Sequence, residues 1–538
     1  SPSPTSTTTP SDSTVPTAFT VRGRGFGHGV GMSQYGAQAQ ALAGRTATEI
    51  IEFYYTGADV KPLRDDQVIA VNILHRVTRF NLQLRQVDET PQIPIDDAGA
   101  VGDFVTSTRS KLSQAGARYR FDVGGTASKP LVVVTQIDSK GKQTEFIAAG
   151  GINIHWGGTR EPERAGSVPA YADVAGPGEG MRDGYGRYRY GNLRVTAVRY
   201  DDNGTMRTSL EVANNVRIHD EYLRGIGEVP ASWQPAALQA QVIASRGFAL
   251  AAARSSVKYT CGCQLYDGTG SQVFAGWMRE VGYSSSSNLA RASQLGIAAP
   301  GRVLAGTPAP SASAATPTAT KSPTSSSSTS ASSSASRKPT ASSSSAKPTG
   351  TATSPTSTPT LTPTPSSTPT QTKTSTPTPS WSPTAELPLP SNIFGRKWAQ
   401  AVLATSTSLT HGRTATVDGK AITTYFYSAS GGRTENSEDI WGGKLSYARS
   451  IADPWSLDDV VPDYIRDWRV TVSQKEMSTF FGLSDVISVS IGDKTQGGAA
   501  ITVIARSLGG STSTRKGTDL RRTFDLRSRW LTSIKRRE

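Results

Sequence analysis

Cysteine is scarce in this sequence, and several other features are missing altogether. Two of the 538 residues are cysteines, Cys261 and Cys263, which fits either a reducing compartment or an exported protein that does not rely on disulfides. No uninterrupted apolar run reaches about 18 residues, so we expect no transmembrane span. There is no Lys/Arg run interleaved with aromatics and no helix-turn-helix, zinc-finger or RNA-binding signature, which argues against a dedicated nucleic-acid reader.

Acidic residues are outnumbered by basic ones. The sequence has 57 Lys and Arg against 43 Asp and Glu, which gives a net charge of +14. A surface of this sign favours polyanions such as nucleic acid, an anionic membrane or an anionic cell-wall polymer. The charge alone does not choose among these partners.

Two segments have too few apolar side chains to fold. Residues 1–16 are rich in Ser, Thr and Pro and predict a disordered tether. Residues 284–392, which include a long Ser/Thr/Pro tract, predict a disordered insertion. Such tracts favour export over a reducing compartment. The chain begins at Ser1 without Met, from which we expect a mature form whose secretion signal has been removed.

Ordered elements are predicted on both sides of the insertion. After a Gly-rich turn, a first helix is expected over 38–42, and a second in "TATEIIEFYY", capped by Thr46 or Thr48. Residues 61–220 carry short alternating runs such as "KPLVVVTQI", which predict antiparallel strands. After the insertion the sequence returns to short strands and turns.

The clearest helix lies in "SWQPAALQAQVIASRGFALAAARS". Ser232 is a reasonable N-cap and Pro235 suits the first turn, while Leu238, Val242 and Ala249 fall on one face. We therefore predict an α+β fold of mainly antiparallel strands packed around this central helix. We expect five parts. Residues 1–16 are a tether, and residues 17–60 are an N-terminal helical segment that docks on the main domain. Residues 61–283 are a strand-rich region with the first part of that domain, residues 284–392 are the insertion, and residues 393–538 are the second part of the domain.

Glu228 is the first candidate for chemistry. It lies in "EYLRGIGEVPASW", in a turn whose neighbours Ile226, Val229 and Trp233 are apolar. A carboxyl group in such surroundings loses hydration, which raises its pKa and lets it act as a general acid near neutral pH. From the spacing alone, the simpler interpretation is an exposed loop carboxylate, or one favoured by the positive end of the helix dipole.

The stretch "EYLRGIGEVPASWQPAALQAQVIASRGFAL" resembles the core motif of the stage II sporulation protein D (SpoIID/LytB) family. Three more stretches are similar to that family: "GSQVFAGW" at 270–277, "TTYFYSASGGRTENSEDIWGG" at 423–443 and "GRGFGHGVGMSQYGA" at 23–37. The last usually comes near the end of the family domain, whereas here it comes first. Because chain ends often lie close together in space, we expect it to dock on the same fold.

The resemblance implies an extracellular, cell-wall-associated protein that acts on peptidoglycan glycan strands. Active members of the family are lytic transglycosylases, and the resemblance places their catalytic glutamate at Glu228; we expect no cofactor in this chain. In that reaction the muramic acid C6 hydroxyl attacks C1 and leaves a 1,6-anhydro end, so one carboxyl group suffices where ordinary glycosidases need two. The alternative is a non-catalytic protein that binds wall glycan or enhances an amidase, which would then be a partner. An adhesive surface protein on Ser/Thr/Pro stalks would explain the insertion but not Glu228.

Further residues of the matching stretches are expected to line the substrate cleft. Small residues in "YSASGGRTE" would let sugar hydroxyls approach the backbone, although a plain strand-to-loop turn fits equally well. Gln241 and Arg246 could hold the acid loop or contact glycan, with a capping Gln and a surface Arg as the alternatives. For His28, Ser33 and Gln34, the alternative to a place in the cleft is a glycine turn with a purely structural role. The full expected substrate-binding set is Gln241, Arg246, Tyr427, Ser428, Ser430, Gly431, Gly432, Thr434, His28, Ser33 and Gln34.

Some positions depart from the family pattern. Its Ala-Arg-Thr-Tyr is Ser-Arg-Gly-Phe at 245–248, and Gln239 replaces the usual lysine, which favours the non-catalytic alternative. The residues Glu435, Glu438 and Asp439 could supply a second carboxylate, but a solvated acidic run near a helix start is the simpler interpretation. Trp441 could stack on a sugar, although an isolated Trp more often belongs to a core.

The two cysteines are not expected to bind metal. Some members of the family hold zinc near this place with Cys and His, yet the closest histidine in this sequence is His219. Cys261 and Cys263 are separated by one residue, so we expect free thiols or a labile disulfide.

Overall fold

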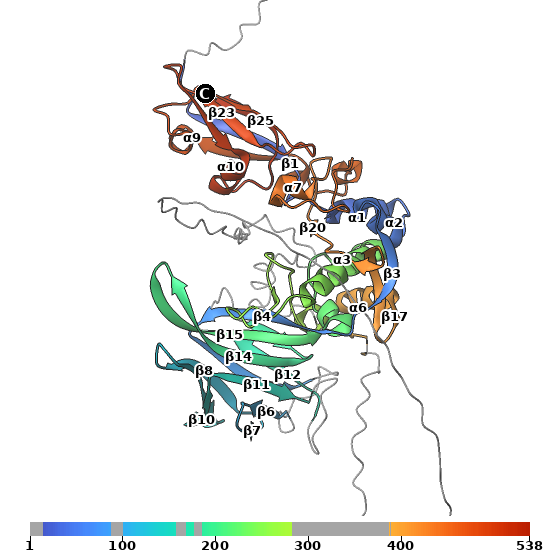
Figure 1. The fold of residues 1–538 in the computed structure, drawn as a ribbon, viewed down its shortest axis with the longest axis vertical. Coiled ribbons are helices and arrows are strands. Elements are labelled where there is room, and N and C mark those ends of the chain that lie inside the picture. Colours follow the sequence, from blue (N-terminus) through green and yellow to red (C-terminus); the bar gives the residue numbers. More distant parts are fainter. Residues whose placement is uncertain (1–13, 88–99, 158–167, 177–184, 282–386, 388) are drawn as a thin grey trace, which may run out of the picture. The chain divides into compact units, whose positions relative to one another are not determined.

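The structure, a computed structural model, describes residues 14–87, 100–157, 168–176, 185–281, 387 and 389–538. Most of the predicted tether and of the predicted insertion lies outside these residues. The described chain combines helices with strands that pair mainly antiparallel, which confirms the predicted fold class (Figure 1). The boundaries between the expected parts stay a prediction.

The strand-rich region forms two sheets. Alternate side chains point inward, as in β5, where Phe80 and Leu82 are fully buried. The ring of Phe104 on β6 in one sheet lies 6.1 Å from that of Phe121 on β8 in the other, so the two sheets share one hydrophobic core. The first sheet has the order β10-β9-β8-β5-β12-β13, with β5 at Arg79–Gln86, β8 at Arg118–Gly125, β9 at Pro130–Ile137, β10 at Gln143–Ala149, β12 at Ala170–Ala175 and β13 at Tyr185–Tyr188. The second has the order β16-β4-β15-β14-β11-β6-β7, with β4 at Val68–Val77, β6 at Gly102–Val105, β7 at Ser110–Leu112, β11 at Gly151–Trp156, β14 at Asn192–Asp202, β15 at Thr205–Arg217 and β16 at Leu265–Tyr266.

The central helix α3 spans Pro235–Ala253, and its predicted buried face is confirmed. Leu238, Val242 and Ala249 are all buried. The predicted N-cap, Ser232, is wrong. Pro235 occupies the first helical position, so the residue before it, Gln234, is the N-cap. Around α3 pack α1 (Gln34–Leu42), α2 (Ala47–Tyr54), α6 (Ile393–Thr405) and β18 (His411–Val417).

The two N-terminal helices are defined by their caps. α1 begins at Gln34, four residues earlier than predicted, because the Ser33 side chain accepts a hydrogen bond from the Gly36 N–H and caps it there. Gly44, just beyond the helix, has a φ of +87°, a left-handed conformation that ends helices and favours glycine. Thr46 caps α2 through a capping box with Glu49, so Thr46 and not Thr48 is the cap.

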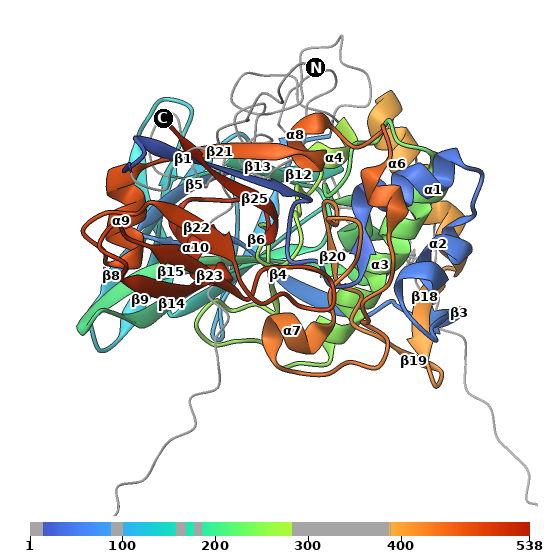
Figure 2. The same ribbon diagram turned by 90° about the horizontal axis from the view of Figure 1, so that it is seen from above.

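Segments far apart in the sequence pair with one another. In the sheet β21-β1-β25, strand β1 (Ala18–Arg24) lies between β21 (Trp468–Ser473) and β25 (Trp530–Arg537), as Figure 2 also shows. Its buried Phe19 and Val21 belong to a second core. That core also contains residues of α9 (Gln474–Phe481), β22 (Ser488–Ile491), β23 (Thr502–Arg506) and α10 (Gly517–Thr523); β24 (Thr512–Lys516) pairs with β23.

The remaining elements connect these parts. Strand β3 (Asp59–Arg64), from before the predicted insertion, pairs with β18, from after it. Strand β2 (Met32–Ser33) pairs in parallel with β20 (Phe426–Tyr427). The other short elements are η2 (Ile218–Tyr222), α4 (Met278–Val281), β17 (Ser406–Ser408), β19 (Lys420–Ala421), α7 (Ser437–Trp441), η3 (Pro454–Leu457) and α8 (Asp463–Arg466). A search of the described residues finds no helix with the length and hydropathy that a membrane span needs.

Candidate active site

The loop that carries Glu228 is held by the "GSQVFAGW" stretch. The Gly227 N–H donates to the Val273 carbonyl over 2.8 Å, and the Val273 N–H donates to Glu228 Oε1 over 2.6 Å. A bridge between Ile226 and Phe274 continues the pairing. Two of the stretches that resemble the family therefore meet at Glu228, and a backbone donor fixes one of its carboxylate oxygens.

The surroundings of Glu228 favour its protonated form. The side chain is only partly exposed, and burial raises its pKa to about 7. Hydrogen bonds from the Val273 backbone and from the Gln34 amide stabilise the charged form and oppose that shift. The structure thus gives Glu228 the loss of hydration that the sequence predicts, and with it a pKa near neutral.

A chain of amides links Glu228 to the central helix. Gln34 Nε2 lies 3.4 Å from Glu228 Oε2 and 3.3 Å from Gln241 Oε1. Gln241 Nε2 in turn donates to Ser245 Oγ, one helical turn further along α3. Ser33, next to Gln34, has its hydroxyl 2.7 Å from that of Ser456. The "GHGVGMSQYGA" stretch therefore reaches Glu228, and of the expected substrate residues Gln34 and Gln241 are the two that the structure brings to it.

Two residues near Glu228 did not emerge from the sequence. The Tyr222 hydroxyl donates to Gln272 Oε1 over 2.7 Å, and Gln272 Nε2 donates to the Ser245 carbonyl. Burial raises the pKa of Tyr222 well above its usual value, and the negative charge of Glu228 adds to that shift. Both residues lie inside the stretches that resemble the family, which is the signal that could have found them.

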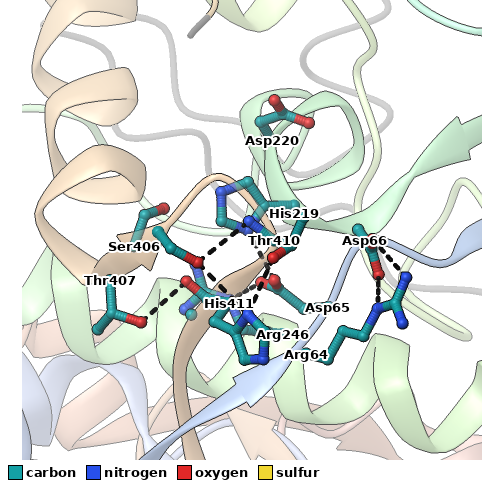
Figure 3. A network of polar contacts seen from close by, with 12 residues as sticks. Arg64, Asp65, Asp66, His219, Asp220, Arg246, Ser406, Thr407, Thr410 and His411 are labelled. Carbon is teal, nitrogen blue, oxygen red and sulfur yellow. Dashed lines mark hydrogen bonds and ion pairs between the residues drawn. The ribbon is translucent and has the colours of Figure 1, made fainter. Parts of the chain in front are cut away.

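Arg246 lies in a buried network of polar contacts. Its Nε donates to Asp65 Oδ2 over 2.7 Å (Figure 3). Its other nitrogens donate to the Arg413 carbonyl and to Thr405 Oγ1, and the side chain is fully buried. His219 Nδ1 contacts the second Asp65 oxygen at 2.6 Å. Arg246 therefore has no surface through which it could contact a glycan, and we assign it to packing.

The "YSASGGRTE" stretch is engaged mainly with the protein itself. Ser430 Oγ donates to Asp453 over 2.7 Å and Thr434 Oγ1 donates to the Arg449 carbonyl over 2.9 Å, and both side chains are fully buried. A Cβ on Gly431 would lie 2.5 Å from the Trp530 ring, so this glycine makes room for Trp530. Four residues of the stretch keep partial access to solvent: Ser428, Gly431, Gly432 and Arg433.

Tyr427 and His28 lie together. Tyr427 is 5% exposed, and its ring centroid is 5.4 Å from that of His28. Burial lowers the pKa of His28 to about 4, with a further contribution from the Arg521 charge, so its ring is neutral near pH 7. His28 Nδ1 accepts a hydrogen bond from the Val30 N–H, which fixes the ring.

The acidic run and Trp441 differ in their surroundings. Glu438 pairs with Arg449 at 2.7 Å and Asp439 is exposed, in line with a solvated run, whereas Glu435 is fully buried and accepts from the Ala499 N–H. Trp441 is 43% exposed at the end of α7, so the interpretation of Trp441 as a core residue is wrong.

Cys261 and Cys263 form a disulfide in this structure. His219 faces Asp65 and not the cysteines. Within the described ranges, no three side chains of the metal-binding types gather closely enough to hold a metal ion.

Comparison with known proteins places this site in a family. Residues 206–299, which include Glu228 and α3, match the SpoIID family model, described as "Stage II sporulation protein". This region of the chain is therefore similar to the SpoIID family, which confirms the resemblance seen in the sequence. Stage II sporulation protein D of Bacillus amyloliquefaciens is 54% identical over 121 residues, which make up 22% of this chain and 33% of that relative. The chain thus spans about a third of the length of the relative that it matches.

Proposed function

We propose that this protein is a secreted peptidoglycan lytic transglycosylase with Glu228 as its general acid and base. The family itself supports a function related to the cell wall. The observation that carries the enzymatic proposal is the state of Glu228: a partly exposed carboxyl group whose pKa burial raises to about 7. Such a group is protonated in about half of the molecules at neutral pH and can still reach a substrate.

The proposed reaction needs one carboxyl group. Glu228 donates its proton to the glycosidic oxygen that leaves C1 of the muramic acid residue, and the C1–O bond breaks. The C6 hydroxyl of the same sugar attacks C1, and its proton passes to the Glu228 carboxylate, which restores the acid. The products are a free 4-hydroxyl on one strand and a 1,6-anhydro end on the other, with no net gain or loss of water.

The groups around Glu228 have separate tasks in this mechanism. The Val273 N–H fixes Oε1, so Oε2, which faces Gln34, is the oxygen that carries the mobile proton. The hydrogen bond from the Gln34 amide to Oε2 is stronger while Oε2 is ionised, which is why it lowers the pKa of Glu228. It therefore stabilises the carboxylate that forms after protonation of the leaving group.

The non-catalytic alternative is favoured by two departures from the family pattern, Gly247 and Gln239. The packing around Gly247 gives that residue a structural explanation and so weakens its support for the alternative. A Cβ at Gly247 would lie 2.5 Å from Thr424 Oγ1 and 3.1 Å from the Ile422 carbonyl, so α3 packs too closely there for a side chain. The glycine therefore has a structural reason. Gln239 lines an open groove of about 390 Å³ with Arg45 and Pro235, and this replacement remains the feature that favours a glycan-binding protein or amidase enhancer.

The deciding experiment is mass spectrometry of peptidoglycan digests. Purified peptidoglycan, with stem peptides intact and removed, is incubated with the wild type and with Glu228→Gln. We expect 1,6-anhydromuramic ends from the wild type and none from the variant, since the amide cannot donate the proton. If neither protein releases product while both sediment with the glycan, the enzymatic proposal is overturned and the binding alternative replaces it.

The proposed setting is the cell wall outside the cytoplasm, with glycan strands as the main partner. Anionic wall polymers fit the net charge of +14. Binding to isolated walls would then weaken steeply as salt is raised, because screening shortens the reach of surface charge. An amidase that removes stem peptides first is a further proposed partner, and a dependence of the digest on prior stem removal tests it.

A further inference from the structure

Four rings form a continuous aromatic surface beside α3, which we call the aromatic platform: Phe248, Tyr425, Trp441 and His28. The ring centroids of Phe248 and Tyr425 are 6.1 Å apart, those of Tyr425 and Trp441 are 4.5 Å apart, and those of Trp441 and His28 are 5.1 Å apart. The rings come from three stretches of the sequence: the stretches with His28 and with Tyr425 and Trp441 pair through β2 and β20, and Phe248 lies on α3.

The platform remains open to solvent. Trp441 is 43% exposed and the other three rings are partly exposed. An exposed Trp in contact with further exposed rings is unusual for a surface with no function, because large aromatic side chains are normally withdrawn into a core or an interface.

The helix connects the platform to the candidate active site. Gln241, Ser245 and Phe248 follow one another at spacings of four and three residues, so they lie along one face of α3. Gln241 is joined to Glu228 through Gln34, and Phe248 is the platform's ring on that same face. Phe248 therefore lies about two helical turns along α3 from Gln241, which contacts Gln34, the amide partner of Glu228.

We propose that the aromatic platform is a subsite for the glycan strand, on which the apolar face of a hexosamine ring stacks against Trp441 and Tyr425. This inference rests on the proposed function, since it extends the substrate along the α3 face from Glu228.

The chemistry of the platform fits a sugar ring. The axial C–H groups of a pyranose form an apolar face that pairs with the negative face of an aromatic ring, while its hydroxyl groups stay in water at the edges. His28 adds a neutral ring, fixed by its bond from Val30, so the platform does not need an anionic ligand. A strand of alternating amino sugars offers such faces repeatedly.

The test measures binding apart from cleavage. Glu228→Gln in the full chain serves as the parent, and sedimentation with purified glycan strands free of stem peptides gives the dissociation constant. Trp441→Ala is expected to weaken binding roughly tenfold, and Trp441→Phe, which keeps a ring, by no more than about threefold. Tyr259→Ala is the matched control, because Tyr259 is a 75% exposed ring in the loop after α3 and outside the platform.

The outcomes separate this inference from the proposed function. If Trp441→Ala binds strands as tightly as its parent, or if Tyr259→Ala weakens binding to the same extent, the platform is not a subsite. Unchanged thermal unfolding of Trp441→Ala shows that a loss of binding is not a loss of folding. If the wild type makes no 1,6-anhydro ends but the ring-dependent binding holds, the proposed reaction fails while the subsite stands.

Discussion

Two carboxyl groups face α3 from different sides and are treated in opposite ways. Asp65 is completely buried and contacts two basic side chains, Arg246 at 2.7 Å and His219 at 2.6 Å. Glu228 keeps partial exposure, and the hydrogen bonds described for it come from neutral N–H donors. The comparison shows how one helix can be anchored by a paired charge and still border a carboxyl group that holds a proton near pH 7.

The two arrangements have different energetic consequences. A buried carboxylate is tolerated when a partner charge and further hydrogen bonds replace its water, as they do for Asp65. The part of the chain that the structure describes pairs no cation with Glu228, so its ionised form is costly, and its raised pKa expresses that cost. We therefore expect substitutions of Asp65 to damage the fold and substitutions of Glu228 to stabilise it.

The largest expected effect follows from removing the paired charge. Asp65→Asn leaves Arg246 buried without a counter-ion, and burial already lowers the pKa of that guanidinium. Breaking one partner of a buried pair costs about 3–5 kcal/mol. Urea unfolding of the full chain should show a loss of that size.

Asp66→Asn is the matched control for Asp65→Asn. Asp66 is the next residue and pairs with the exposed Arg64, so its replacement should cost at most about 1 kcal/mol (Figure 3). Equal losses for the two neighbours would show that the buried pair is not what anchors α3.

Removing the unpaired carboxyl should have the opposite sign. The folded-state pKa of Glu228 is about 7 and its ordinary value is 4.5, so the folded state binds the proton more tightly. Wild-type stability should fall as pH rises from 4.5 to about 7 and then level off. Glu228→Gln escapes this loss, and it should be more stable than the wild type by roughly 3 kcal/mol at about pH 8 and nearly equal at about pH 4.

Glu438→Gln controls for the general effect of removing a negative charge. Arg449 lowers the pKa of Glu438 to about 2 through a hydrogen-bonded pair, so this carboxylate contributes stability above its ordinary pKa. Its amide variant should therefore not gain stability at about pH 8. If both variants gain equally there, net charge and not the burial of Glu228 explains the result.

A smaller effect is expected at Gly247, which lies on α3 next to Arg246. Alanine there would gain about 1 kcal/mol in helix propensity, but its Cβ would lie 2.5 Å from Thr424 Oγ1, and overpacking costs about 1–3 kcal/mol. We expect a net loss on the order of 1 kcal/mol in urea unfolding. Gly150→Ala, whose Cβ would meet nothing within 4 Å, should change stability by less than about 0.5 kcal/mol. A stabilised Gly247→Ala would contradict the close packing.

The comparison also separates what the sequence could predict from what it could not. The apolar neighbours of Glu228 and the buried face of α3 are local patterns, and the structure bears out both. The pairing of Asp65 with His219 and Arg246 joins positions 154 and 181 residues apart, and no local periodicity encodes such contacts. The burial of Arg246 was missed for the same reason, because a helical spacing does not say which side chain has a buried counter-ion.

The smallest effect should come from the Gln34 amide, which links Glu228 to Gln241 on α3. Gln34→Ala removes long hydrogen bonds, 3.4 Å to Glu228 and 3.3 Å to Gln241, so its cost in stability should be about 0.5–1 kcal/mol. The Gln34 bond lowers the pKa of Glu228, so its loss raises that pKa further. The proposed acid must be protonated, hence the fall of kcat/KM above about pH 7 should move to higher pH in Gln34→Ala, measured as release of anhydro ends. A fall at unchanged pH would show that Glu228 does not set the profile.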